Sequence, residues 1–552
     1  MEGVPVLDRP LQHALWPARH DLPISDITVG DLLRQAAARW PDRTALIEGR
    51  AGGSSGRRWT HAELLAECER LACALLTRFQ PGERIAIWAP NAPEWVLIEY
   101  AAALAGLTLV TVNPGYVARE LEFVLRQSNA AGLFLVAEHR GNPMAKTAAE
   151  VAGGLPGLRE ICDIEDEAAL FRTTGDTPPL PAVQPADPAQ IQYTSGTTGF
   201  PKGVVLSHRA LANNAIHYYG VVGLSEGAVT LAMTPLFHTT GCSMAVLGAI
   251  HLGSPLVLLR IFDPDDALYL IETERVEMFL GVPTMLVAMC AAQKARPRDV
   301  SSVQAIAVGG SMVAPELVRE VTELFGARFH TAYGQTECSP LITMTRPGDA
   351  FEDVCTTIGQ AMPCTDLGIF ETAGDKALPC GEVGEIRVRS YALMSGYNDD
   401  PEATAKAIDA EGWLHTGDLG TMDDRGFVTI TGRLKEMIIR GGENLFPAEI
   451  ENVLLEHPDV AEAAVVGVPC PLMGEAVAAF VRLAPGASLD RQALKAHCRT
   501  RMAAQKTPAH WLAVEAWPMT GSGKIQKFAL REIWERELWK LDQSPARSSV
   551  VE

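Results

Sequence analysis

A short segment rich in glycine and hydroxyl residues is the clearest chemical signal in this sequence. It runs Tyr193-Thr-Ser-Gly-Thr-Thr-Gly-Phe-Pro-Lys-Gly203, with three glycines and four Ser or Thr hydroxyls in eleven positions. Backbone N–H groups, hydroxyls and one lysine cation can together surround phosphate oxygens, so the segment predicts a grip on a triphosphate. Its residue order differs from the Gly-x-x-x-x-Gly-Lys-Ser/Thr pattern of P-loop hydrolases. A flexible surface linker would not explain the apolar strand before it or the Pro-Lys-Gly after it.

Four further motifs follow along the chain, and they lie in one consistent order. They are Tyr333-Gly-Gln-Thr-Glu337, His415-Thr-Gly-Asp418, Gly432-Arg-Leu-Lys-Glu-Met-Ile-Ile-Arg-Gly-Gly-Glu-Asn444 and Gly521-Ser-Gly-Lys-Ile-Gln-Lys527. Together the five motifs resemble the adenylate-forming superfamily of acyl-CoA synthetases, luciferases and peptide-synthetase adenylation domains, over nearly the whole chain. The resemblance implies an α/β fold: a large multi-sheet N-terminal domain at 1–433, a hinge at 434–436, a small mobile α+β C-terminal domain at 437–541 and a flexible tail at 542–552.

The resemblance also implies a nucleotide site. Thr194 to Lys202 would hold the phosphates, and Glu337 would reach the Mg²⁺ that bridges them, because a hard cation takes oxygen ligands. Asp418 would accept hydrogen bonds from the ribose hydroxyls, with Arg433 beside it. The Gly309-Gly310-Ser311 loop follows the strand expected at 305–308 and would lie against adenine and the acyl group, since glycines let the backbone approach a ligand closely. The residues expected to bind ATP or AMP are Thr194, Ser195, Gly196, Thr197, Thr198, Gly199, Lys202, Gly309, Gly310, Ser311, Tyr333, Gly334, Gln335, Thr336, Asp418, Arg433 and Lys524.

The activity that the resemblance implies is the joining of a carboxylic acid to a thiol at the expense of ATP. The acid first becomes an acyl-adenylate, and the thiol, most simply that of coenzyme A, then displaces AMP. A carboxylate with a pKa near ~4.3 is already ionised at neutral pH, so the first step requires charge neutralisation rather than a general base. The expected catalytic residues are Lys524, Glu337, Thr194 and His238, with Lys524 neutralising the carboxylate and α-phosphate as they meet.

A second group of residues is expected to serve the thiol. Lys435 falls on the hinge position of the superfamily, where the small domain rotates between the two half-reactions. That rotation would withdraw Lys524 and turn the Arg440-Gly-Gly-Glu-Asn444 face towards a pantetheine tunnel. The residues expected on the hinge and the CoA side are Lys435, Arg440, Gly441, Gly442 and Glu443.

The acyl pocket is expected to include His238, Gly310 and Gly334. In relatives that resemble acetyl-CoA synthetase, a Trp at the place of Gly334 closes the pocket to all but very short acids. Gly334 would remove that wall, and each buried CH₂ would then add roughly 0.8 kcal/mol of affinity. Acetate is therefore expected to be a poor substrate. We expect a medium-chain, branched, alicyclic or aromatic acid, as in the medium-chain fatty-acyl-CoA ligases that the motifs most resemble.

Several alternatives stay open at this point. An amino-acid-activating domain would carry Asp where this chain has His238. A luciferase-like oxygenase is compatible with the motifs, and the thiol could belong to a carrier-protein phosphopantetheine rather than to CoA. A non-catalytic nucleotide-binding relative would be expected to have lost Lys524 or Glu337, yet both are present.

The elements that must position these residues alternate in type from about 27 to 433. Residues 31–39 and 60–76 are expected to form amphipathic helices, and 84–88, 107–112 and 191–193 buried strands. After the phosphate loop, the next regular element is expected near Ser207, a good N-cap. In the small domain we expect a helix at 447–455 and strands at 461–468 and 476–482.

Composition limits the partners. The chain has 552 residues and a formal net charge of −20, which disfavours nucleic acid or an anionic membrane surface as a main partner. The most apolar stretch, 241–259, is broken by His251, Gly253 and Pro255, so we expect buried core rather than a membrane span. Residues 1–20 show no secretory pattern, and the eleven scattered cysteines form no metal-like cluster. These features favour a cytoplasmic enzyme with reduced thiols; a homodimer stays open.

Overall fold

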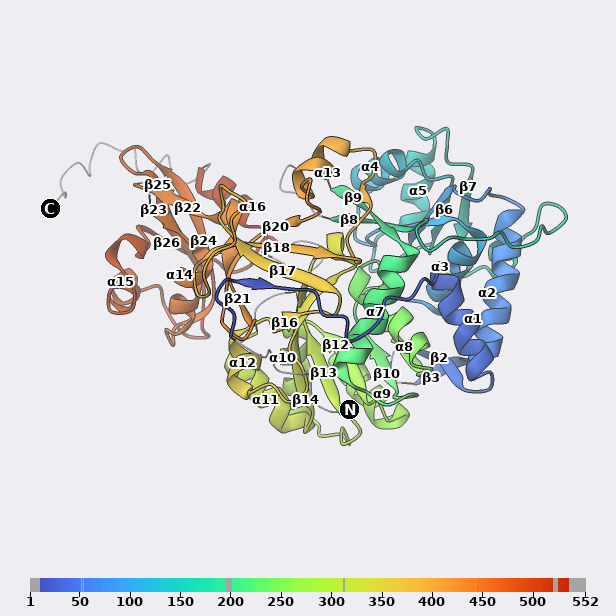
Figure 1. Ribbon diagram of the computed structural model, residues 1–552, viewed down its shortest axis with the longest axis horizontal. Coiled ribbons are helices and arrows are strands. Elements are labelled where there is room, and N and C mark those ends of the chain that lie inside the picture. The colour runs from blue at the N-terminus through green and yellow to red at the C-terminus, as the bar shows by residue number, and fades with distance from the viewer. Residues whose placement is uncertain are drawn as a thin grey trace. The chain divides into compact units, whose positions relative to one another are not determined.

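The computed structural model describes residues 10–50, 52, 54–194, 201–310, 313–441, 443–519 and 525–535, and for 443 and 444 the backbone alone. The chain forms two compact units (Figure 1). The larger contains 1–368, 387–416 and 422–429, and the smaller contains 369–386, 417–421 and 430–552. The expected hinge at 434–436 therefore falls inside the smaller unit by this division, and it stays a prediction.

A nine-stranded sheet in the larger unit has the order β16-β15-β14-β13-β12-β10-β11-β2-β3. Its six central strands, β14 to β2, run parallel, while β3, β15 and β16 pair antiparallel at the two ends. The strands are β2 (Thr44–Gly49), β3 (Ser55–Thr60), β10 (Thr230–Ala232), β11 (Leu256–Leu259), β12 (Met278–Gly281), β13 (Ala305–Val308), β14 (Arg328–Gly334), β15 (Leu341–Met344) and β16 (Gln360–Ala361).

A seven-stranded sheet in the same unit has the order β19-β9-β8-β5-β4-β6-β7. Strands β8, β5, β4, β6 and β7 are parallel, and β9 and β19 extend the edge in antiparallel pairing. The strands are β4 (Arg84–Trp88), β5 (Thr108–Thr111), β6 (Gly132–Leu135), β7 (Glu160–Asp163), β8 (Pro188–Thr194), β9 (Lys202–Ser207) and β19 (Gly396–Tyr397). Buried parallel strands with helical crossovers confirm the α/β class expected from the alternating pattern.

Helices connect the parallel strands, and their starts follow ordinary capping chemistry. Thr28 and Thr60 each form a capping box at the start of α1 and α2, which places these helices close to the predicted ranges. Helices α1, α2 and α3 pack together in the larger unit (Figure 1). The helices of this unit are α1 (Val29–Arg39), α2 (His61–Leu76), α3 (Pro93–Ala105), α4 (Ala118–Ser128), α5 (Met144–Ala152), α6 (Glu167–Leu170), α7 (His208–Val222), the π-helix η1 (Thr240–Leu247), α8 (Gly248–His251), α9 (Pro264–Glu274), α10 (Pro283–Ala295), α11 (Pro315–Phe325), the 3₁₀ turn η2 (Thr336–Cys338), α12 (Phe351–Thr356) and α13 (Pro401–Ala407).

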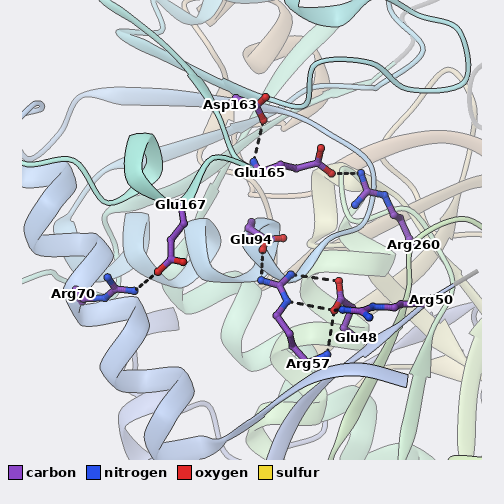
Figure 2. A network of polar contacts seen from close by, with 9 residues as sticks. All are labelled: Glu48, Arg50, Arg57, Arg70, Glu94, Asp163, Glu165, Glu167 and Arg260. Atoms are coloured by element: carbon purple, nitrogen blue, oxygen red, sulfur yellow. Dashed lines mark hydrogen bonds and ion pairs between the residues drawn. The ribbon is translucent and has the colours of Figure 1, made fainter. Parts of the chain in front are cut away.

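Charged side chains tie the two sheets of the larger unit together at their rim. Figure 2 shows Arg57, on β3, between Glu48 on β2 and Glu94 in the first turn of α3. Its guanidinium lies 3.3 Å from Glu48 Oε2 and 2.6 Å from Glu94 Oε1. Burial acts to raise the pKa of Glu48, but hydrogen bonds from Arg57 and Arg50 outweigh it and lower that pKa. Arg57 thus joins the nine-stranded sheet to a crossover helix of the seven-stranded one.

The smaller unit is α+β, as the sequence predicts. Its sheet has the order β23-β22-β25-β24, and β26 pairs parallel with β25. The helix and two long strands lie close to the expected ranges. The elements are η3 (Leu434–Glu436), β22 (Ile438–Arg440), β23 (Glu443–Leu445), α14 (Pro447–Leu455), β24 (Val460–Cys470), β25 (Gly474–Leu483), α15 (Arg491–Arg499), η4 (Ala504–Lys506), β26 (His510–Ala513) and α16 (Lys527–Ile533).

Five strands remain, and within four of them the chain passes from one unit to the other. The first, β1 (Leu15–Trp16), pairs antiparallel with β17 through Trp16 and Leu367. The others are β17 (Thr365–Phe370), β18 (Gly384–Ser390), β20 (Leu414–Met422) and β21 (Val428–Arg433).

The apolar stretch 241–259 lies in the interior, where it forms η1, α8 and β11. Within the described part of the chain, no helix has the length and apolar character needed to cross a membrane. All eleven cysteines are free thiols, and seven of them are buried.

Candidate active site

Four neighbouring parallel strands bring several predicted residues to one sheet edge. Strands β10, β12, β13 and β14 are adjacent in that order. His238 lies in the segment after β10, Gly309 and Gly310 follow β13, and Tyr333 and Gly334 end β14. Because the carboxyl ends of parallel strands lie at the same edge, this edge is where an α/β sheet ordinarily binds its ligand.

Two glycines at this edge are required by close approach of the backbone. A Cβ added to Gly309 would lie 2.9 Å from the Ala332 carbonyl oxygen, and one added to Gly334 only 1.9 Å from that of Pro340. The Pro340 carbonyl accepts a 2.8 Å hydrogen bond from the Gln335 N–H, so it cannot move away freely. Gly334 therefore has a backbone role, whatever its effect on the size of the acyl pocket. The pocket interpretation of Gly334 stays a prediction.

The predicted phosphate segment is the connection of a β-hairpin. Strands β8 and β9 pair antiparallel, with Tyr193 opposite Gly203 and Thr194 opposite Lys202. The expectation that the next regular element begins near Ser207 was wrong, because β9 comes first and already includes Ser207. Ser207 is nevertheless the N-cap of α7, where its side chain accepts a 3.2 Å hydrogen bond from the Ala210 N–H. The loop residues Ser195, Gly196, Thr197, Thr198 and Gly199 lie outside the described residues, as does Ser311.

Lys202 and Glu337, predicted from separate motifs, meet at the same tyrosine. The Lys202 Nζ lies 4.5 Å from the centre of the Tyr397 ring, and the Tyr397 hydroxyl donates a 2.9 Å hydrogen bond to Glu337 Oε1. Glu337 sits in η2, directly after the predicted Tyr-Gly-Gln-Thr sequence, with Thr336 beginning that turn. The side-chain amide of Gln335 donates a 2.9 Å hydrogen bond to the Thr416 carbonyl, which links this motif to the next one. The side chains of Lys202, Glu337 and Tyr397, which form this cluster, are all half-buried.

The segment that carries His238 is held by its main chain. The buried side chain of Asn91, which follows β4, donates hydrogen bonds to the Thr234 and Leu259 carbonyls at 3.0 and 3.1 Å and accepts one from the Leu236 N–H at 2.8 Å. Thr111, at the end of β5, donates a 2.9 Å hydrogen bond to the Phe237 carbonyl. Both anchors come from the seven-stranded sheet. They fix the start of the π-helix η1, a helical form that often occurs at functional sites.

The predicted ribose residues form an ion pair in the smaller unit. Asp418, on β20, is 4% exposed, and its Oδ1 lies 3.0 Å from Arg433 Nε at the end of β21. This places the two residues side by side, as the family resemblance implies.

The residues predicted for the hinge and for CoA come directly after Arg433 in the chain. Lys435 lies in η3, and Arg440 ends β22 and donates to the Gln505 carbonyl. Gly441 adopts φ +59° and its N–H donates a 2.8 Å hydrogen bond to the Met473 carbonyl. Gly442, the side chain of Glu443 and Lys524 lie outside the described residues, as does the tail at 542–552.

Lys527 joins the last motif to the hinge segment. Its Nζ lies 2.7 Å from Glu436 Oε2 in η3 and 2.8 Å from Glu451 Oε1 on α14. Burial acts to lower the pKa of Lys527, but the two carboxylates outweigh it and raise that pKa, so the lysine is charged at neutral pH. Sequence reasoning quoted Lys527 as part of a motif without giving it a partner.

Comparison with known sequences decides the family. The profile described as "AMP-binding enzyme" matches residues 33–398, and the profile described as "AMP-binding enzyme C-terminal domain" matches residues 449–524. The chain belongs to the AMP-binding enzymes. The first profile covers the Lys202, Glu337 and Tyr397 cluster, and the second ends at Lys524.

Relatives of this AMP-binding enzyme are similar along nearly their whole length. YngI of Bacillus subtilis strain 168, a candidate acyl-CoA synthetase by its name, is 38% identical over 92% of this chain and 96% of its own. The mitochondrial medium-chain acyl-CoA ligase ACSF2 of Macaca fascicularis is 34% identical over 93% of this chain and 88% of its own. Among solved structures, the o-succinylbenzoate CoA synthetase MenE of Bacillus subtilis, in complex with its acyl-adenylate intermediate, has a TM-score of 0.80 and 29% identity, over 92% of this chain and 98% of that one.

Tyr397 and Asn91 are the site residues that sequence reasoning missed. A Gly-Tyr pair in a polar segment and an asparagine before Pro93 carry little signal by themselves. Their partners lie far away along the chain, at Lys202 and Glu337 and at 234–236. Only the folded sheets bring these residues together.

Proposed function

We propose that this AMP-binding enzyme is an AMP-forming acid–CoA ligase that prefers a medium-chain, branched, alicyclic or aromatic carboxylic acid. The observation that carries the proposal is the match to both family profiles, with Lys202 and Glu337 of separate motifs meeting at one place in the larger unit. The similarity to ACSF2, named a medium-chain acyl-CoA ligase, supports the acid class. So does the buried, largely apolar helix η1 that follows His238.

The first half-reaction is an electrostatic problem. An oxygen of the substrate carboxylate forms a bond to the α-phosphorus of ATP, the bond from that phosphorus to the bridging oxygen breaks, and pyrophosphate leaves with the electron pair. Both reactants are anions, so positioning and charge neutralisation lower the barrier. We assign the phosphates to the 194–202 loop with its Lys202 ammonium, and the ribose to Asp418. Lys524 neutralises the charge that develops between carboxylate and α-phosphate.

The residues present fit a magnesium ion at Glu337. Within the described residues no group of three or more His, Cys, Asp or Glu side chains could hold a metal. Mg²⁺ does not require such a cage, because it commonly binds one or two carboxylates together with substrate phosphates and water. The half-buried Glu337 carboxylate, oriented by the Tyr397 hydroxyl, supplies such a ligand. When bound, the cation would neutralise phosphate charge during attack.

In the second half-reaction the CoA thiol attacks the acyl carbon. The bond from carbon to the adenylate oxygen breaks, and AMP leaves. We assign the approach of CoA to the segment Arg440–Glu443 and the accompanying rotation to the hinge around Lys435.

A two-stage assay tests the function. Pyrophosphate release with ATP and Mg²⁺ is measured over a panel of acids from acetate to dodecanoate, with cyclohexanecarboxylate and benzoate, in the presence and absence of CoA. We expect release to require an acid, turnover to require CoA, and kcat/KM to be highest for acids of six or more carbons, acetate being poor. Turnover with a phosphopantetheinylated carrier protein but not with CoA would overturn the ligase assignment. An optimum at acetate would overturn only the acid class.

Lys524→Ala separates the half-reactions. We expect adenylation to fall by on the order of a hundredfold or more, while formation of thioester from supplied acyl-adenylate stays within threefold, because the charge serves only the first transition state. Rapid-quench assays of each half-reaction measure the two effects. Equal losses in both would contradict the role of Lys524.

A further inference from the structure

We infer that Tyr397 is a positioning residue that keeps the Lys202 ammonium and the Glu337 carboxylate apart, so that Lys202 meets phosphate while Glu337 meets the metal. The inference deepens the proposed function and rests on it for the identity of the ligands. The contacts themselves are properties of the larger unit.

One side chain contacts both charges through different parts. The Lys202 Nζ lies 4.5 Å from the ring centre, where the negative face of an aromatic ring attracts a cation. The hydroxyl, at the ring's far end, donates at 2.9 Å to Glu337 Oε1. In the described part of the chain no ion pair joins Lys202 directly to Glu337, although the two opposite charges contact the same side chain.

Main-chain bonds hold Tyr397 in this place. The Met394 N–H donates to the Glu337 carbonyl at 2.8 Å, and the Asn398 N–H donates to the Gly203 carbonyl at 2.7 Å. The segment 394–398 is therefore bonded at one end to the residue bearing the carboxylate and at the other to the neighbour of Lys202. Strands β19, β9 and β8 form this edge of the seven-stranded sheet, and β9 and β8 are labelled in Figure 1.

Side chains around the tyrosine add further anchors. The Tyr397 N–H donates to Thr404 Oγ1 at 2.9 Å, and the Asn398 amide donates to the Gln127 carbonyl at 2.8 Å. Gly396 adopts φ +148°, and a Cβ there would lie 3.0 Å from the Thr404 side chain. The ring thus has little freedom to leave the two charges.

The tyrosine serves as a neutral donor. Its hydroxyl donates a 2.9 Å hydrogen bond to Glu337 Oε1, and a hydroxyl carries no charge. A neutral hydroxyl orients the carboxylate without cancelling its charge. A direct lysine would cancel that charge and remove a ligand from the metal.

Two substitutions separate the contacts. Tyr397→Phe keeps the ring and removes the hydroxyl, whereas Tyr397→Leu removes both. ATP binding is measured by titration calorimetry on the whole chain, without acid substrate, once with EDTA and once with Mg²⁺. The Mg²⁺ gain is the ratio of ATP affinity in Mg²⁺ to ATP affinity in EDTA. For Tyr397→Phe we expect ATP affinity in EDTA to stay within about twofold of wild type. We expect the Mg²⁺ gain to fall about tenfold, the effect of losing one hydrogen bond to a charged group. For Tyr397→Leu we expect affinity in EDTA to fall about tenfold as well, because Lys202 then pairs with Glu337.

A double-mutant comparison identifies the group through which the hydroxyl acts. In a Glu337→Gln background, Tyr397→Phe is expected to change the Mg²⁺ gain by less than about twofold, because the charged partner is already lost. Tyr391→Phe is the matched control: its hydroxyl lies 2.8 Å from His217 Nδ1, and its loss is expected to leave the Mg²⁺ gain unchanged.

The outcomes decide the inference. The inference would be overturned if Tyr397→Phe weakened ATP binding equally in EDTA and in Mg²⁺. It would also be overturned if Tyr397→Phe lowered the Mg²⁺ gain by about tenfold in the Glu337→Gln background. If Tyr397→Leu fails to fold, the Phe variant and the double mutant still decide. Since no acid or CoA takes part, a failure of the proposed ligase activity would appear in the turnover assay and not here.

Discussion

The two units position their candidate residues by different means. In the larger unit, main-chain hydrogen bonds fix the segments: Asn91 holds 234–236, and Gln335 binds the Pro340 carbonyl. In the smaller unit, ion pairs hold the candidate segments: Arg433 pairs with Asp418, and Lys527 pairs with Glu436 and Glu451. Buried main-chain bonds are little affected by salt, whereas ion pairs with an exposed partner are screened. The difference favours a preformed site in the larger unit and, in the smaller unit, contacts that salt weakens, above all that of Arg433, whose side chain is 54% exposed.

The largest expected effect comes from the glycine at the end of β14. Gly334→Ala places a Cβ 1.9 Å from the Pro340 carbonyl oxygen, so we expect unfolding free energy to fall by on the order of 2–4 kcal/mol. Urea unfolding measures the loss. Gly153→Ala is the control, because nothing lies within 4 Å of its added Cβ, and it should change stability by less than about 0.5 kcal/mol.

Equal stability of the two alanine variants would show that the backbone around Pro340 adapts, and the larger unit would then be less preformed than argued. The same variant is also the reference for the pocket. Gly334→Trp adds this backbone conflict to any change in acyl space, so its chain-length profile must be compared with that of Gly334→Ala.

Lys527→Met tests the charged anchor of the smaller unit. It leaves Glu436 and Glu451 facing each other without a cation, and we expect the smaller unit to lose about 2 kcal/mol of stability. Lys527→Arg keeps the positive charge and should retain more than half of the stability that Lys527→Met loses. Thermal unfolding at low salt and in 0.5 M NaCl provides the measurement, and the deficit should shrink as salt screens the two carboxylates. A deficit that Arg does not restore would mean that packing, rather than charge, holds this segment.

A buried carboxyl in the larger unit gives a pH-dependent test. Burial raises the pKa of Glu99 well above its usual value, against a 2.7 Å hydrogen bond from the Gln190 amide. An acid whose folded pKa exceeds its unfolded pKa binds more protons when folded, so stability falls as pH rises from about 4.3 towards the folded pKa. Glu99→Gln should remove this slope, which is up to about 1.4 kcal/mol per pH unit. Parallel stability curves for wild type and variant between pH 5 and 8 would contradict the assignment.

The smallest effect is expected for an exposed ion pair of the smaller unit. Arg501 Nε lies 3.0 Å from Glu456 Oε2, and both side chains are largely exposed. Arg501→Gln should cost about 0.5 kcal/mol or less, because solvent screens the pair. A loss as large as that of Lys527→Met would show that the unit depends on its surface charges generally and not on the Lys527 anchor.

The sequence alone predicted the class of fold, and its motifs supplied a set of candidate site residues that stay predictions. Hydrophobic periodicity located α1, α2 and β4, and Asp418 lies beside Arg433 as the resemblance implies. Strand β9 was missed because its short apolar run follows directly on a glycine-rich loop. The contacts of Tyr397 with Lys202 and Glu337 depend on where distant segments return, and no local pattern encodes that.

The anchoring by Asn91 has a consequence for altering what the enzyme accepts. Its three hydrogen bonds all go to main-chain atoms, at 234, 236 and 259. Main-chain groups are the same for every residue type except proline, so the half-buried side chain at 237 can be exchanged while the scaffold that presents it persists. A library varied at 237, with Asn91, His238 and the buried Leu236 retained, should consequently yield many folded proteins, and the same library built on Asn91→Leu should yield few.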